Sequence, residues 1–101
     1  MTKEQIKDKI SKALSIAPHR GQIKSLAIFG SYIKGQVDES SDIDLLVEFL
    51  PDAHIGLFEF VGIKEHFSSE LGIKVDLVTP AALSKYFREE VFRQAEPIYE
   101  K

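Results

Sequence analysis

The spacing of hydrophobic positions predicts three helices. Residues 3 to about 16 place an apolar side chain at every fourth position behind the capping-box sequence Thr2-Lys3-Glu4-Gln5, which is typical of an amphipathic helix. Residues 57–71 repeat apolar side chains every three or four positions and end at Gly72, a typical C-cap. A third helix is predicted to begin at Thr79-Pro80 and to be ended by Pro97, because proline suits the first turn of a helix and stops its interior.

Three short apolar runs predict strands. They cover residues 25–29, which end at Gly30, residues 42–49, which are stopped by Pro51, and the β-branched run 73–78. The resulting order is helix, strand, turn, strand, helix, strand, helix. This order favours an α/β fold with a small sheet covered by helices, and it leaves the strand directions open.

Length and composition narrow the class of protein. The chain has 101 residues, so residues 1–101 are expected to form a single domain. It contains no apolar run of 18 residues and no basic start followed by an apolar stretch, which argues against a membrane span and a secretory signal and favours a cytoplasmic protein. It has no cysteine, so any metal must be held by oxygen or imidazole ligands. A formal net charge of −3 makes non-specific binding to nucleic acid unfavourable.

Aspartates on two of the predicted strands are the strongest chemical signal. Asp42 and Asp44 are two residues apart, so on a strand their side chains leave the same face with Cα atoms about 6.6 Å apart. Carboxylates at this spacing suit a pair of magnesium ions, which lie about 3.5 to 4 Å apart where they bridge a phosphate. Asp76 interrupts the third apolar run, where an unpaired carboxylate would be costly to bury. If the third strand lies beside the second, Asp76 would supply a third metal ligand.

The turn after the first strand is a candidate phosphate-binding loop. Backbone N–H groups at Gly30-Ser31, the Ser31 hydroxyl, the Lys34 ammonium group and the nearby Gly35 could surround phosphate oxygens. Gly35 is also a common turn residue, and Lys34 is also typical of a solvated loop. From residue 31 to residue 48 there are five acidic side chains and one lysine, so a triphosphate would need divalent cations to bind here.

These motifs resemble a known family. The sequence Phe29-Gly30-Ser31, ten further residues, Asp42-Ile43-Asp44 and a later isolated Asp76 are similar to the signature of DNA polymerase β-type nucleotidyltransferases. Within that superfamily the short chain resembles the minimal nucleotidyltransferases, the MntA-type antitoxins of HEPN/MNT toxin–antitoxin pairs. The resemblance implies a polymerase β-like fold with a mixed sheet. The family commonly has arginine where this chain has Lys34, and lysine keeps the charge but loses the bidentate fork.

The resemblance also implies an activity. Asp42 and Asp44 would hold two Mg²⁺ or Mn²⁺ ions, Asp76 would hold the catalytic one, and Gly30-Ser31 would hold the triphosphate of ATP. AMP would be transferred to a tyrosine of a HEPN toxin encoded by a neighbouring gene. Two alternatives remain open at this point: an antitoxin that neutralises its partner by occlusion without catalysis, and a nucleotidyltransferase that acts on a small molecule or an RNA end.

Overall fold

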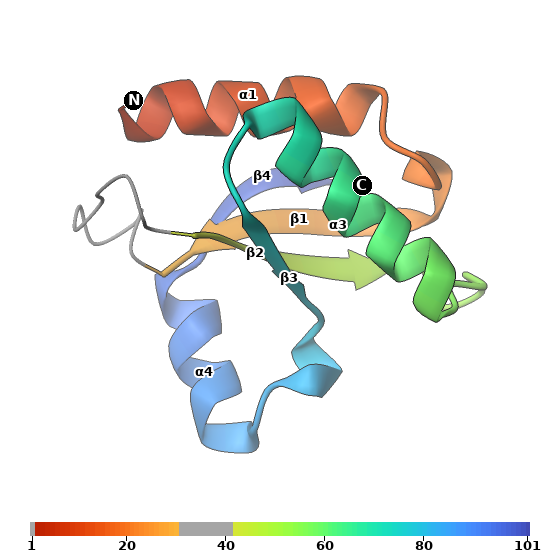
Figure 1. Cartoon of the computed structure of the whole chain (residues 1–101). Coiled ribbons are helices and arrows are strands. Elements are labelled where there is room, and N and C mark those ends of the chain that lie inside the picture. The colour runs from red at the N-terminus through yellow and green to blue at the C-terminus, as the bar shows by residue number, and fades with distance from the viewer. Residues whose placement is uncertain (1, 31–41) are drawn as a thin grey trace.

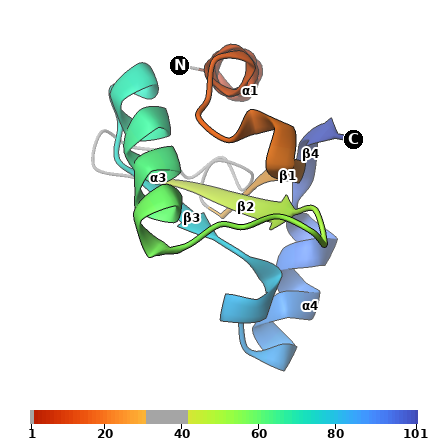
Figure 2. The same ribbon diagram turned by 90° about the vertical axis from the view of Figure 1, so that its right-hand side faces the viewer.

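The computed structural model describes residues 2–30 and 42–101, which form one four-stranded sheet with helices on both faces (Figures 1 and 2). The elements are α1 (Lys3–Ser15), the 3₁₀ turn η1 (Arg20–Gln22), β1 (Ile23–Phe29), β2 (Ile43–Phe49), α3 (Leu57–Leu71), β3 (Val75–Val78), the 3₁₀ turn η2 (Pro80–Ala82), α4 (Lys85–Gln94) and β4 (Glu96–Glu100). The strand order is β3-β2-β1-β4. Strand β2 runs parallel to β3, and β1 is antiparallel to both β2 and β4. The predicted small mixed sheet is therefore confirmed.

Helices α1 and α3 cover one face of the sheet, as their apolar spacing predicts. The Thr2 hydroxyl accepts a hydrogen bond from the Gln5 backbone N–H at 3.1 Å, and the Gln5 side chain accepts one from the Thr2 N–H at 2.8 Å, which completes the capping box. Gly72 ends α3 with φ at 69°, a left-handed conformation that favours glycine. None of the helices in the described part of the chain has the length and apolar content needed to cross a membrane.

The main hydrophobic core lies between these two helices and the sheet. Strands β2 and β3 present every second side chain to this core, whereas the alternation in β1 is interrupted by a register shift between Ile23 and Ser25. Its members, all buried, are Ile6, Ile10, Ala13, Leu14, Ile23, Leu26, Ile28, Ile43, Leu45, Val47, Ile63, Phe67, Leu71, Val75 and Leu77. The intervening strand residues, Asp44 and Asp76 among them, therefore face the opposite side.

Helix α4 lies on that opposite face and covers only part of it. A smaller buried cluster of Phe29, Leu46 and Val91 joins α4 to β1 and β2. The helix predicted from Thr79-Pro80 begins later than expected. Residues 80–82 form only a 3₁₀ turn, and the Ser84 hydroxyl accepts a hydrogen bond from the Phe87 N–H at 3.4 Å to cap the true start of α4.

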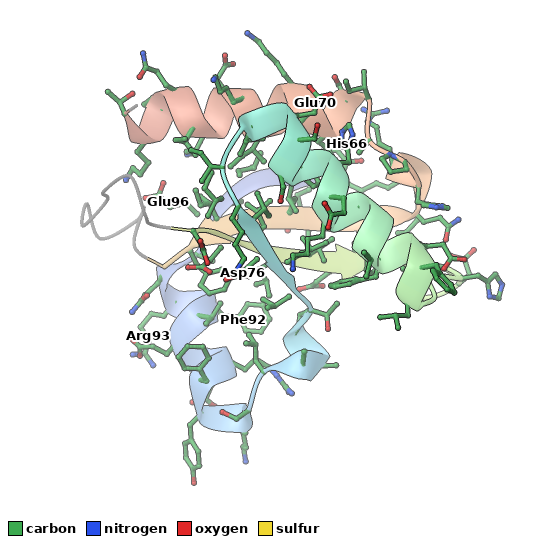
Figure 3. All side chains as sticks on the ribbon, viewed as in Figure 1. His66, Glu70, Asp76, Phe92, Arg93 and Glu96 are labelled. Atoms are coloured by element: carbon green, nitrogen blue, oxygen red, sulfur yellow. The ribbon has the colours of Figure 1, made fainter. Side chains whose placement is uncertain are left out.

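The fourth strand is absent from the sequence prediction. Pro97 was expected only to end a helix, but the helix ends at Gln94 and Pro97 lies within β4, at the edge of the sheet, where a missing backbone N–H is tolerated. The strand is tied to α1 because Glu96 accepts from Lys3 Nζ at 2.8 Å and lies 3.5 Å from Lys7 Nζ (Figure 3). The starts of three strands also differ slightly from the prediction: β1 begins at Ile23, β2 at Ile43 and β3 at Val75.

Candidate active site

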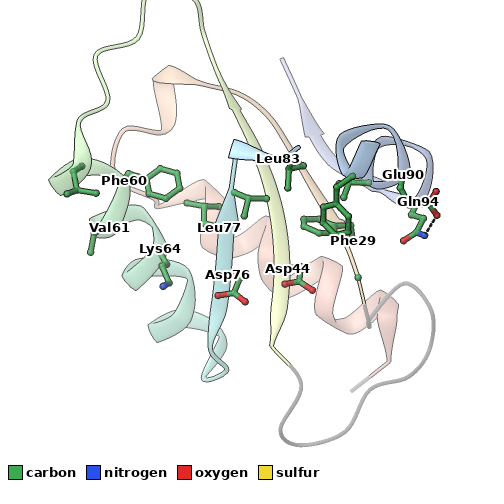
Figure 4. A pocket seen from close by; sticks show the side chains of 15 residues that line it. Phe29, Asp44, Phe60, Val61, Lys64, Asp76, Leu77, Leu83, Glu90 and Gln94 are labelled. Carbon is green, nitrogen blue, oxygen red and sulfur yellow. Dashed lines mark hydrogen bonds between the residues drawn. The ribbon is translucent and has the colours of Figure 1, made fainter. Parts of the chain in front are cut away.

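Asp44 and Asp76 lie side by side on neighbouring strands. They are register partners in the parallel pairing of β2 with β3, so their side chains leave the same face of the sheet (Figure 4). Both line a cavity of about 590 Å³. The condition under which Asp76 would join Asp44 is therefore met, because the third predicted strand does lie beside the second.

The cavity has the sheet as its floor and helices α3 and α4 as its two walls (Figure 4). Its charged lining consists of three acidic side chains and one lysine: Asp44, Asp76, Glu90 and Lys64. The rest of the described lining is mostly apolar: Phe29, Gly30, Leu57, Phe60, Val61, Leu77, Val78, Leu83, Phe87, Val91 and Gln94. A mostly apolar lining with a few charged side chains is typical of a small-molecule site.

Gly30 brings the backbone directly against one of the carboxylates. It follows β1 with φ at +83°, a conformation that side-chain-bearing residues rarely adopt. A Cβ atom at this position would clash with Asp44 Oδ2. The register pair of Phe29 with Asp44 explains the contact, because the end of β1 lies beside the start of β2. Glycine is therefore required here by both the backbone angle and the close approach.

Asp42 lies next to this pair but has a different partner. Its Oδ2 atom is 3.7 Å from Lys74 Nζ, and this ion pair joins the residue before β2 to the one before β3. Within residues 2–30 and 42–101, no three metal-binding side chains are already gathered around one point. The described structure thus brings Gly30, Asp44 and Asp76 into one cavity, while Asp42 stands beside it. Ser31, Lys34 and Gly35, the remaining predicted nucleotide-binding residues, lie outside the described residues.

The electrostatics of the site favour a bound cation. Partial burial, followed by the negative charges of Asp76 and Asp42, raises the pKa of Asp44 from 3.8 to about 6. A carboxylate destabilised by burial and by like charges is stabilised when a cation binds between them. Oxygen donors are the ligands that Mg²⁺ and Mn²⁺ prefer. Asp44 and Asp76 therefore fit a divalent cation, which their carboxylates would hold in the cavity that they line.

Two features of the site were not predicted from the sequence. Lys64 and Glu90 line the cavity from α3 and α4, yet each is an ordinary polar position in an amphipathic helix. The sequence signal that could have identified Lys64 is its spacing from Leu57 and Val61. These three residues follow one another at three- and four-residue intervals and share one face of α3. That face is distinct from the buried face that contains Phe67.

The fold and the paired carboxylates beside a glycine turn define a nucleotidyltransferase. The model of the family "Polymerase beta, Nucleotidyltransferase" matches residues 8–101, and the chain belongs to this family. One relative is the Methanocaldococcus jannaschii protein MJ0128, whose name classes it with the protein adenylyltransferases. It is 40% identical to this chain over 93 residues, which cover 89% of this chain and 91% of the relative. "Protein adenylyltransferase MntA" of Thermococcus cleftensis is 30% identical over 94 residues and 93% of each chain.

Solved structures show the same likeness. A minimal nucleotidyltransferase shares 32% identity over 96% of each chain, with a TM-score of 0.79. A chain from a toxin–antitoxin complex with AMP-PNP shares 25% identity, with a TM-score of 0.74, over 94% of this chain and 73% of that one. The predicted membership of the minimal nucleotidyltransferases is confirmed.

Proposed function

We propose that this chain transfers AMP from ATP to a hydroxyl group of a partner protein, a tyrosine of a HEPN toxin, and that it acts in this way as the antitoxin. The observation that carries the proposal is the register pair of Asp44 and Asp76 on the floor of the cavity, with Gly30 against Asp44. The adenylyltransferase names of the relatives and the toxin–antitoxin complex with AMP-PNP support the donor and the kind of partner.

The positions of Asp42, Asp44 and Asp76 support a metal-binding role, and the sequence supports the phosphate-binding role of the turn. Asp44 and Asp76, joined by Asp42 on release from Lys74, would hold two Mg²⁺ ions. Bound metal would neutralise the carboxylates and polarise the phosphate that is attacked. The turn that begins at Gly30, with Ser31, Lys34 and Gly35, would bind the triphosphate through backbone N–H groups and one lysine charge.

A second candidate function has an observation in its favour. Several large apolar side chains of α3 and α4 are exposed, among them Phe58 at 91% and Tyr86 at 87%. Exposed aromatic residues are enriched at protein interfaces. An antitoxin that only occludes its toxin could use these exposed side chains without any transfer reaction.

Stoichiometry separates the two functions. The purified product of the adjacent gene is incubated with Mg-ATP and one tenth of its molar amount of this chain, and its intact mass is then measured. Transfer predicts complete addition of AMP and loss of toxin activity, and the Asp44→Asn variant should do neither. Neutralisation only at equal molar amounts, without ATP and without added mass, would establish occlusion instead.

A further inference from the structure

The groups of the site form a row across the sheet. The end of β1 with Gly30 lies beside Asp44 on β2, and Asp44 lies beside Asp76 on β3. Because β3 is an edge strand against which α3 packs, the α3 wall with Lys64 comes next in the row (Figure 4). The row therefore begins at the glycine turn and ends at a lysine.

We propose that Lys64 is a catalytic residue on the acceptor side of the site, where its ammonium group stabilises the negative charge that develops on the attacking hydroxyl oxygen. This inference rests on the proposed function. It adds a residue that the motifs do not contain, because Lys64 belongs to α3 and lies twenty residues after Asp44 in the chain.

The expected direction of the reaction places Lys64 on the acceptor side of the site. In a phosphoryl-type displacement the attacking and leaving oxygens are roughly in line, on opposite sides of the phosphorus. If the turn at Gly30 binds the triphosphate, pyrophosphate leaves toward the β1 end of the row. The acceptor must then approach from the α3 end, where Lys64 lines the cavity that also contains Asp76.

The surroundings of Lys64 suit a protein acceptor. Leu57 and Val61 line the same α3 wall and are 77% and 43% exposed. An apolar wall offers nothing to a triphosphate, but it can pack against the aromatic ring of an acceptor tyrosine. Among the described residues that line the cavity, Lys64 is the one cation, and it shares the space with Asp44, Asp76 and Glu90. Its charge is thus the one available in this lining to stabilise an oxyanion.

The step balances without a further reactant. The acceptor oxygen forms a bond to the α-phosphorus of ATP, the bond from that phosphorus to the bridging oxygen breaks, and pyrophosphate carries away the electron pair. The hydroxyl proton passes to solvent. A positive charge near the oxygen favours its ionised form, so proton loss becomes easier near neutral pH.

The test compares Lys64→Gln with Lys64→Arg and with Lys9→Gln, a matched control that removes the same charge from an exposed position of α1. The assay measures AMP transfer to the acceptor protein at pH 7 to 9.5, and calorimetry measures binding of Mg-AMP-PNP. We expect Lys64→Gln to lower the transfer rate at pH 7 by about 10²-fold, the usual cost of removing one group that stabilises an oxyanion. Lys64→Arg should retain activity within about tenfold, and Lys9→Gln should match the wild type.

Two further readouts separate catalysis from structure. Binding of Mg-AMP-PNP should be unchanged in Lys64→Gln, and its deficit in rate should shrink as the pH rises toward the ordinary tyrosine pKa of about 10. A rate within twofold of wild type, a deficit constant across the pH range, or loss of AMP-PNP binding would each overturn the role of Lys64. Absence of transfer by the wild-type chain would instead refute the proposed function.

Discussion

Replacing Asp44 by asparagine should stabilise the metal-free protein at neutral pH. Burial and the nearby acidic side chains raise the pKa of Asp44 from 3.8 to about 6 in the folded chain. The ionised form is therefore less stable in the folded state than in the unfolded one, so the penalty on folding grows as the pH rises from about 4 to about 6 and is complete above about 6. Asparagine has nearly the same shape and carries no charge, so it removes the penalty.

The size of the effect follows from the shift in pKa. A change of about 2 units corresponds to about 3 kcal/mol, since one unit is about 1.4 kcal/mol. Asp44 is only partly buried, and the solvent that reaches it screens the charges, so we expect about 1 to 2 kcal/mol. For a domain of this size each kcal/mol raises Tm by about 4 to 8 °C. The gain in stability should fade as the pH decreases from 6 to 4, because the Asp44 carboxyl of the folded wild type then becomes protonated and loses its charge.

Urea unfolding in EDTA at pH 7.5 and pH 4.5 tests the prediction, with Asp52→Asn in an exposed turn as the control. Adding Mg²⁺ at pH 7.5 should stabilise the wild type and not the Asp44→Asn variant, because only the wild type keeps the paired carboxylates. The electrostatic reasoning is refuted if Asp44→Asn is no more stable than the wild type at pH 7.5. It is equally refuted if the gain is the same at both pH values.

Two other substitutions test the local geometry. Gly30→Ala should lower stability by about 1 to 3 kcal/mol and reduce AMP transfer, because it places a Cβ atom against Asp44 at a position with positive φ. Gly21→Ala is the control in the same unfolding and transfer assays, because the Cβ added there meets nothing within 4 Å. Phe67→Ala should cost about 3 to 5 kcal/mol in urea unfolding, because its ring is fully buried between α1, α3 and the sheet; a cost below 1 kcal/mol would contradict that packing.

Local signals predicted the helices that they cap. Thr2 with Gln5 sets the start of α1, and Gly72 sets the end of α3, because each cap is satisfied by residues close in sequence. At Thr79-Pro80 the same logic was wrong. The chain there makes one 3₁₀ turn and then extends, and the start of α4 falls to Ser84. Proline is compatible with both outcomes, so its presence alone does not choose between them.

Long-range signals were harder to read. The strand β4 pairs with β1 from the far end of the chain, and Pro97 within it hides the usual pattern of a strand. The approach of Asp44 to Asp76 could be predicted only on the condition that their strands are neighbours. The face of the strand on which each side chain lies follows from the local sequence, but the order of the strands in the sheet does not. The Asp42–Lys74 ion pair depends on the pairing of β2 with β3, and the position of Lys64 depends on how α3 packs beside β3. No local pattern encodes either arrangement.

The hydrophobic core holds the carboxylates in place. Asp44 is flanked by Ile43 and Leu45, and Asp76 by Val75 and Leu77, all of them buried against α1 and α3. A slip of one residue in either strand would turn an aspartate into that core and an apolar side chain into the cavity, so the burial of the flanking residues opposes it strongly. Partial burial and the like charges together penalise the ionised Asp44 by about 1 to 2 kcal/mol, and burying each large apolar side chain that flanks it contributes about as much by itself. The register of β2 and β3 therefore survives the repulsion, and the carboxylates remain paired when no metal is bound.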